Sequence, residues 1–555
     1  MVMANKRTVK AKKPAAGGDR LLVPQGCVTV RMYRHGLGDC FLLGFGTESA
    51  SQPCYVLIDC GVHMRQDNGT ERLGAVMEDV VAATNGKIHV VVATHEHADH
   101  LSGFVQQGSP FLNGRLQIEQ FWVAWTEKVG DQQADQLRMK RGAAREAIQR
   151  AVEKLKQAQQ PLADRIMGLM DFESLSSDML VEPSLMAGAQ PKKKPSSNEI
   201  ALEFLQQRAS RTRYCEPGEM LELPGVKNAR AFTLGPPREQ ELLKRALPSE
   251  SQTATRETYL AGRAHHQTFL AAPGLDDETN GKLAWVTARK LHEDLRHPFE
   301  ERVRRSYRLG ANASQPQWGA ASRPETQAFY QECYFGAAEW RRIDGDWLAA
   351  AEELALDLDS DTNNTTLVLA FEWGDPGQGD VFLFAGDAQV GNWLSWRRQS
   401  YRAGESSMSA DDLLRRTILY KVGHHGSHNA TLKIDPSETT ASCPTGVPFG
   451  LELMPSKLVA FIPVDRSAVA KPMPRPWHMP HPPMYRRLLD KSSGRVLRSD
   501  GLEPESGVGP VNPLLPKGSA PAKVPGMTNV EWREARAMFK MGRPCPLYYD
   551  ITFRR

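Results

Sequence analysis

The chain has 555 residues, of which 41% are hydrophobic and 24% charged, so its composition excludes a collagen-like or largely disordered protein. No segment approaches the roughly 18 consecutive apolar residues that cross a bilayer, and the start of the chain lacks the apolar stretch of a secretory signal. The eight cysteines form no C-x-x-C pair and are too sparse for a disulfide scaffold. We therefore expect a soluble, cytoplasmic protein without membrane attachment.

The net charge of +4 originates at the start of the chain. Residues 1–20 hold six Lys or Arg and one Asp, a net +5, so the other 535 residues sum to −1. We expect 1–20 to be a disordered basic tail, either simply solvated or in contact with a polyanion such as nucleic acid.

Short apolar runs separated by Gly, Ser and Pro predict several strands after this tail. A helical spacing over 71–84 places a helix among them. The alternation of strands and a helix is typical of α/β proteins, so we expect 26–125 to form the first half of an α/β core. The predicted strands carry the sequences CVTVRMYRHG, CFLLGFG, CYVLIDCG, KIHVVVATH and QIEQFWVAW.

The middle of the chain has a different pattern. A long polar stretch from Gln132 has the apolar spacing of a helix, and shorter helical patterns such as REQELLKRAL follow the loop PKKKPSS. We expect 126–355 to be a large, mostly helical insertion in the core.

Strand patterns return after the insertion. The stretch DDLLRRTILYKV is predicted as a helix, and 483–501 as a helix, a turn and a strand. We expect 356–500 to form the second half of the core, and 501–555 to be a Pro- and Gly-rich loop with a closing strand. The other predicted strands are NNTTLVLAFEW, DVFLFAGD and KLVAFIPVD, and the closing strand is CPLYYDITF.

The strongest chemical signal is THEHADH at 94–100, which directly follows an apolar strand. In extended chain His95 and His97 point the same way and can bind one metal ion. Once the chain turns, Asp99 and His100 can reach a second ion. Imidazole and carboxylate ligands suit Zn²⁺, with Mn²⁺ or Fe as chemical alternatives. A chance histidine cluster in a loop is the competing explanation, and the density of the motif argues against it.

Two later segments supply further ligand types. FLFAGDA ends a predicted strand with Asp387, whose carboxylate can bridge two cations. KVGHHGSH places His424 and His425 beside glycines. Each segment alone is a weak signal. Together with the first motif, and in this order, they are a far more specific signal of a metal site.

This combination resembles the metallo-β-lactamase fold superfamily, and within it the hydrolase domain of the competence DNA-uptake protein ComEC. Besides H-x-H-x-D-H, the resemblance is carried by GLGDCFLL, LIDCG, NNTTLVL, AGD, KVGHHGS and HPPMYRRLL. It implies an αββα sandwich, in which two facing sheets are flanked by helices and the metals lie at one edge. The ComEC membrane segments have no counterpart here, so a role in DNA transport does not follow.

The resemblance also implies roles for individual residues. The metal ligands of the first motif would be His95, His97, Asp99 and His100. Asp387 would bridge two ions, and either His424 or His425 would complete the second site. Asp59, and with weaker support Asp39, would orient the ligand loop from behind the ligands. His481 would contact the substrate or protonate the leaving group. The residues that would contact the substrate are Asn363, Asn364, Thr366 and Ser427.

One feature of many superfamily members is absent from the core segments. They have a further histidine between H-x-H-x-D-H and the bridging Asp, whereas here that interval offers only histidines of the insertion, which we expect to be surface or packing residues. Occupancy by a single metal therefore stays open. The insertion histidines are His265, His266, His292 and His297.

The resemblance implies a hydrolase that uses a metal-bound hydroxide, oriented by Asp99. It favours phosphodiesters, with nucleic acid first, and the basic tail, PKKKP and ERVRRSYR are compatible with phosphate contacts. One alternative is a hydrolase of a small-molecule ester or lactam-type ring, with the insertion as a lid. An alternative of another class is an interaction protein, in which the insertion docks a protein partner and the metal centre is structural or regulatory.

Overall fold

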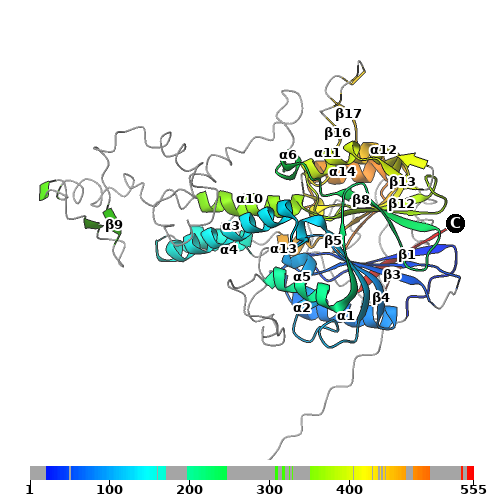
Figure 1. Cartoon of the computed structure of the whole chain (residues 1–555), viewed down its shortest axis with the longest axis horizontal. Helices are drawn as coiled ribbons and strands as arrows, with labels where there is room; N and C mark the ends of the chain where they lie inside the picture. The colour runs from blue at the N-terminus through cyan, green and yellow to red at the C-terminus, as the bar shows by residue number, and fades with distance from the viewer. Residues whose placement is uncertain are drawn as a thin grey trace, which may run out of the picture.

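In the computed structural model, the described part of the chain forms two large mixed β-sheets and a set of helices (Figure 1). The described residues are 20–48, 52–64, 66–158, 160–170, 197–246, 307–309, 316–318, 324–325, 328, 350–469, 479–500, 539–541 and 547–555, apart from 404–405, 428, 436–437, 439, 441 and 444–445.

The first sheet has eight strands and joins both ends of the described chain. Strand β1 pairs antiparallel with the C-terminal strand β21, from Cys27–Arg554 to Tyr33–Tyr548. Pairing is antiparallel from β20 to β3 and parallel from β3 to β6. In spatial order the strands are β20 (Phe539–Met541), β21 (Tyr548–Arg554), β1 (Cys27–Tyr33), β2 (Cys40–Phe45), β3 (Cys54–Cys60), β4 (Lys87–Ala93), β5 (Gln117–Ala124) and β6 (Ala209–Cys215).

The second sheet has seven strands. Pairing is parallel from β19 to β12 and antiparallel from β12 to β7. In spatial order the strands are β19 (Val496–Arg498), β18 (Val459–Ile462), β15 (Thr417–Lys421), β12 (Asp380–Phe384), β11 (Val368–Trp373), β8 (Ala229–Gly235) and β7 (Met220–Glu222).

Apolar side chains of the two sheets pack against each other. One hydrophobic cluster takes residues from both sheets, and within it the ring of Phe41 meets that of Phe384 edge to face, with centroids 5.5 Å apart. Two further clusters join the opposite face of each sheet to helices. Many strands are therefore buried on both faces, which explains their near-continuous apolar runs.

The covering helices differ between the two sheets, and Figure 1 shows one set on each side of the strands. The first sheet packs against α1 (Gly69–Thr84), α2 (Ala98–Val105) and α5 (Ser197–Arg208), and the second against α11 (Val390–Ser395), α12 (Ala410–Arg415) and α14 (Pro482–Lys491).

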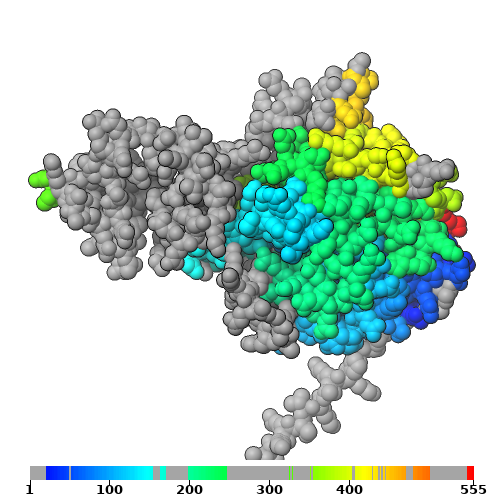
Figure 2. Space-filling model, in the orientation of Figure 1, coloured from blue at the N-terminus to red at the C-terminus, as the bar shows by residue number. Residues whose placement is uncertain are grey.

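Three helices form a unit with its own apolar core. These are α3 (Gln132–Ala158), α4 (Gln160–Met170) and α10 (Ala350–Asn364), and Figure 1 shows them projecting from one side of the two-sheet body. The space-filling view shows the cyan segment, which contains α3, lying directly against the green segments of the body (Figure 2). Helices α3 and α4 of this unit lie within the expected insertion, whereas α10 begins near its end and continues into the segment predicted as the second half of the core.

The expectation of a mostly helical insertion over 126–355 misses three strands of the two sheets. Strand β6 belongs to the first sheet, and β7 and β8 belong to the second. The sequence ASRTRYC of β6 carries too few apolar residues to show a strand alternation, because six of its seven positions are only partly buried or exposed. The short helix α6 (Gln240–Leu243) replaces the longer pattern predicted there.

Two element boundaries near the site also differ from the predictions. The strand predicted from Asn363 begins only at Val368, because α10 continues through Asn364. The helix predicted for DDLLRRTILYKV ends at Arg415, and Thr417–Lys421 form β15. The β-branched and aromatic residues Thr417, Ile418 and Tyr420 favour the strand, which the helical spacing of the preceding residues obscured.

Several predictions fall outside the described residues: nearly all of the basic tail 1–20, the loop 191–195, the Pro- and Gly-rich loop after 501 and the four histidines of the insertion. Among the helices that the structure describes, none is long and apolar enough to cross a membrane.

Candidate metal centre

The THEHADH motif forms the loop between β4 and α2 and the first turn of that helix. His97 is the extended residue that precedes α2, and Asp99 and His100 lie in the first turn. The side chains of His95, His97, Asp99 and His100 are all buried. The loop therefore carries four potential ligands into the interior at the carboxyl end of a parallel strand, as the sequence predicts.

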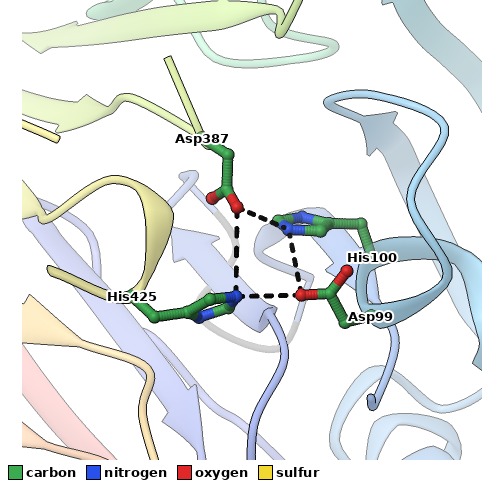
Figure 3. A group of neighbouring side chains, drawn as sticks. All are labelled: Asp99, His100, Asp387 and His425. Carbon is green, nitrogen blue, oxygen red and sulfur yellow. Dashed lines mark hydrogen bonds and ion pairs between the residues drawn. The ribbon is translucent and has the colours of Figure 1, made fainter. Parts of the chain in front are cut away.

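Four side chains from three separate segments converge beside this loop (Figure 3). Asp99, His100, Asp387 and His425 are buried, and each offers a ligand atom within 4.8 Å of the others. Nε2 of His425 lies 2.9 Å from Oδ2 of Asp99, and Nε2 of His100 lies 3.4 Å from Oδ2 of Asp387. The folded chain thus brings together one carboxylate and one histidine of the first motif with Asp387 and the later histidine.

The donor set of this cluster fits a divalent metal ion. Nε2 of His100 and Oδ1 of Asp99 are buried and make no hydrogen bond to any described residue. Such atoms are costly to bury without a partner, and a bound cation supplies one. Two imidazoles and two carboxylates are ligands that Zn²⁺ accepts.

Asp59 holds His100 from behind the cluster. Its carboxylate accepts hydrogen bonds from the backbone N–H and the hydroxyl of Thr94 at 2.8 Å, and lies 2.8 Å from Nδ1 of His100. Asp59 has a left-handed backbone with φ 55°, which aims the carboxylate at this loop. The orienting role expected for Asp59 therefore has its contacts in the structure. Asp39 lies further from His100, at 3.8 Å.

Lys421 is a component of the centre that the sequence analysis did not single out, although it begins the quoted motif KVGHHGS. Its buried ammonium group contacts Asp39 at 2.5 Å, Asp387 at 3.1 Å and the carbonyl of Gly386 at 2.7 Å. Oδ1 of Asp387 also accepts a hydrogen bond from the backbone N–H of His424 at 3.0 Å. Lys421 therefore occupies one oxygen of Asp387 and leaves the other facing His100.

The charges of the cluster stabilise one another in the metal-free protein. Burial alone would lower the pKa of His100, but the carboxylates of Asp387 and Asp99 outweigh it and raise that pKa well above the ordinary value. Burial would raise the pKa of Asp387, yet Lys421 and His100 hold it well below its usual range. Protonated histidine thus neutralises carboxylates that a metal ion would neutralise in the loaded protein.

The two adjacent histidines of HHGS have different surroundings. Nδ1 of His425 lies 2.7 Å from the carbonyl of Pro463, which leaves Nε2 facing Asp99. Nδ1 of His424 lies 2.9 Å from the hydroxyl of Ser427, and Nε2 lies 3.5 Å from the amide of Asn363. Both residues have positive φ, 45° and 49°, so the backbone turns sharply between them. The structure therefore places His425 in the cluster and His424 beside it.

His95 and His97 form a pair next to the cluster. Nε2 of His95 lies 3.0 Å from Nδ1 of His97, and the rings of His95 and His100 have centroids 4.1 Å apart. Nε2 of His97 lies 3.9 Å from a carboxylate oxygen of Asp359 on α10. Among the described residues, these two histidines do not join the four-residue group. A first metal position at His95 and His97 stays a prediction.

Two of the predicted substrate residues have structural partners. The amide of Asn364 donates to the carbonyls of Leu242 at 2.6 Å and Leu243 at 2.8 Å, and its oxygen accepts the N–H of Asn392. Asn364 therefore ties α6 to α11. The hydroxyl of Ser427 bonds to Asn429 at 2.7 Å as well as to His424, so it fixes the HHGS turn. The motifs NNTTLVL and KVGHHGS, which suggested these roles, did not reveal these partners.

The other predicted residues lie near the centre. Asn363 contacts His424 and donates to Asp359 at 3.1 Å. The methyl group of Thr366 packs against Gly386, where an added Cβ would lie 2.1 Å from it. The backbone N–H of His481 donates to the carbonyl of Gly426 at 2.7 Å, so this residue adjoins the HHGS turn. Their roles toward a substrate stay predictions.

His35 is a further residue that the sequence analysis passed over. It is fully buried, with Nε2 2.6 Å from the carbonyl of Gly61. Burial lowers its pKa to about 4, so it is neutral at pH 7 and Nε2 donates to that carbonyl. Only its position beside GLGDC, which was quoted for the resemblance, could have drawn attention to it.

Neither a family model nor a curated protein matches this chain.

Proposed function

We propose that the chain is a metal-dependent hydrolase with a metallo-β-lactamase-like αββα sandwich, and that phosphodiesters are its substrates. The observation that carries the proposal is the convergence of Asp99, His100, Asp387 and His425, with unpartnered buried ligand atoms on Asp99 and His100. Two facing sheets with helices on their outer faces are compatible with the sandwich. Further support for the proposal comes from the order of the motifs H-x-H-x-D-H, AGD and KVGHHGS along the chain.

The residues of the centre have distinct roles in this proposal. Divalent metal ions at such a centre lower the pKa of water and polarise the substrate oxygens. His100 and His425 would bind the ion through Nε2, because Asp59 and the Pro463 carbonyl occupy their Nδ1 atoms. Oδ2 of Asp387 would be a ligand, while Lys421 holds Oδ1.

Asp99 has two tasks in the proposed reaction. In the metal-free protein Oδ2 pairs with Nε2 of His425, a contact that a bound ion would replace, and Oδ1 would be left to bind the ion or to orient the attacking water. His481 follows the turn that carries His425 and is our candidate for protonating the leaving group. Imidazole suits this step because its ordinary pKa lies near neutrality.

A panel of substrates tests the proposed class. Single- and double-stranded DNA and RNA, and bis-(p-nitrophenyl) phosphate, are incubated with the full chain and Zn²⁺ or Mn²⁺. We expect cleavage of at least one of them, and nucleic-acid binding that weakens steeply with salt if a polymer is the substrate. Metal binding without any phosphodiester cleavage would contradict the substrate class and favour the small-molecule hydrolase. A protein that binds no metal would contradict the hydrolase itself and favour the interaction protein.

A further inference from the structure

Glu96 lies between the two histidines of the ligand loop and is 1% exposed. The rings of His95 and His97 contact each other, with Nε2 of His95 3.0 Å from Nδ1 of His97. The carboxylate of Glu96 instead pairs with Arg145, and it lies 3.4 Å from Nε of Arg141. The loop that carries the candidate ligands thus also holds a buried negative charge.

The two arginines come from α3, the long helix of the three-helix unit. They are one turn apart, so both lie on the same face of the helix. Arg141 also contacts Glu127 at 3.1 Å and the hydroxyl of Thr365 at 3.2 Å. Arg145 also lies 3.5 Å from Glu199 of α5. Both guanidinium groups are more than nine-tenths buried.

The main chain of Glu96 is fixed as well. Its carbonyl accepts a hydrogen bond of 2.6 Å from the amide of Asn198, a buried residue of α5. Thr365, which Arg141 contacts, is two residues before Leu367, whose N–H donates to the carbonyl of Thr94 at 2.8 Å. Arg141 and Arg145 thus contact Thr365 and Glu199, which lie close in sequence to the residues that fix the main chain of the loop.

We propose that Arg141 and Arg145 are positioning residues, which hold the ligand loop in its metal-binding shape through Glu96. The inference rests on the proposed metal-dependent function and gives part of the insertion a role in it: α3 belongs to the metal centre. A buried carboxylate without a partner carries a large desolvation penalty. Without the arginines, Glu96 must move toward water. Because Glu96 lies in the same loop as His95, His97, Asp99 and His100, its movement would displace these side chains, two of which belong to the four-residue cluster.

The test measures Zn²⁺ affinity of the full chain by competition with a chelating dye, together with thermal unfolding of the metal-free protein. Arg145→Met removes the principal partner of Glu96. The double variant Glu96→Gln/Arg145→Met removes the ion pair without leaving the carboxylate of Glu96 buried and unpaired, and Arg141 keeps Glu127 as its partner. Arg150→Met is the matched control, because Arg150 lies on the same helix in an exposed pair with Glu146.

We expect Arg145→Met to bind Zn²⁺ about tenfold or more weakly, the scale of losses when supports of a metal site are removed. The double variant should regain thermal stability and still bind more weakly than the unaltered chain, and Arg150→Met should match the unaltered chain. A double variant that binds Zn²⁺ as tightly as the unaltered chain would overturn the positioning role, even if Arg145→Met does not fold. An unaltered chain that binds no Zn²⁺ would instead overturn the proposed function.

Discussion

The carboxylate of Asp59 lies 2.8 Å from Nδ1 of His100, and the same oxygen accepts a hydrogen bond from the hydroxyl of Thr94. This contact makes Nδ1 the protonated nitrogen and gives Nε2 the lone pair that a metal ion requires. Nε2 faces Asp99 and Asp387, at 3.7 and 3.4 Å. Asp59, near the end of β3, thereby sets the tautomer of His100, a candidate ligand in the first turn of α2.

Replacing Asp59 tests this relationship. In Asp59→Asn one carboxylate oxygen becomes an NH₂ group, which cannot accept from both Thr94 and His100. Asn tolerates the left-handed backbone at this position better than Ala does. We expect Zn²⁺ affinity to fall by about 10- to 100-fold in a dye-competition titration. Asp375→Asn, at an exposed turn, is the control, and equal affinities for both variants would refute the orienting role.

The two histidines of HHGS should respond differently to replacement. Only His425 faces the cluster, so His425→Gln should lose most of the bound metal. His424→Gln should keep the metal, because His424 contacts Ser427 and Asn363. Metal content of the two purified variants, measured by mass spectrometry, decides the assignment. The reverse order of loss would show that His424 is the ligand.

Lys421 should be essential for the stability of the metal-free protein. It is 1% exposed and lies between two carboxylates, so Lys421→Met leaves Asp39 and Asp387 without their cation. Removing one partner of a buried ion pair costs about 3–5 kcal/mol of unfolding free energy. Urea unfolding with a chelator present measures this cost. Lys457→Met, in an exposed pair with Asp380, should change stability by less than about 1 kcal/mol.

An effect of Lys421→Met no larger than that of its control would show that Lys421 does not neutralise this site.

His35 should make the protein sensitive to acid. Its pKa is lowered to about 4 in the folded protein, from the ordinary 6.5. The unfolded chain therefore binds the proton more readily between these values, and stability is lost as the pH falls from about 6.5 to 4. At about 1.4 kcal/mol per pKa unit, the loss is about 3 kcal/mol.

His35→Gln keeps a donor for the Gly61 carbonyl and does not titrate in this range. The difference in unfolding free energy between the unaltered chain and His35→Gln, measured in urea at several pH values, isolates the contribution of His35. We expect this difference to shift against the unaltered chain as the pH falls to 4. A difference that does not change with pH would mean that burial of His35 does not alter its titration.

Much of the candidate site could be predicted from the sequence, because its candidate ligands lie within short motifs at strand ends. His95, His97, Asp99 and His100 follow one apolar strand, and Asp387 follows another. The convergence of these segments depends on long-range strand order, which no local pattern specifies. The choice between His424 and His425 depends on two left-handed residues in succession, which sequence spacing does not reveal.

The fold was predicted least well where local patterns conflict with tertiary pairing. Strand β6 has mostly polar residues and is held by its parallel pairing with β5. Helix α10 continues through Asn363 and Asn364, although the sequence analysis predicted these two residues as the start of a strand. Lys421 and His35 were missed because a buried lysine or histidine looks like any other until its partners are known. Those partners lie on other strands and loops.

The most direct test of the metal centre is the metal content of the full chain, purified without chelators and measured by inductively coupled plasma mass spectrometry beside Asp99→Ala and Asp387→Ala. We predict at least one tightly bound divalent ion per chain in the unaltered protein and a large loss of metal in both variants. Circular dichroism confirms that the variants are folded. The proposed metal centre would be contradicted if the unaltered chain held no metal after incubation with Zn²⁺, Mn²⁺ or Fe²⁺. It would also be contradicted if the folded variants held as much metal as the unaltered chain.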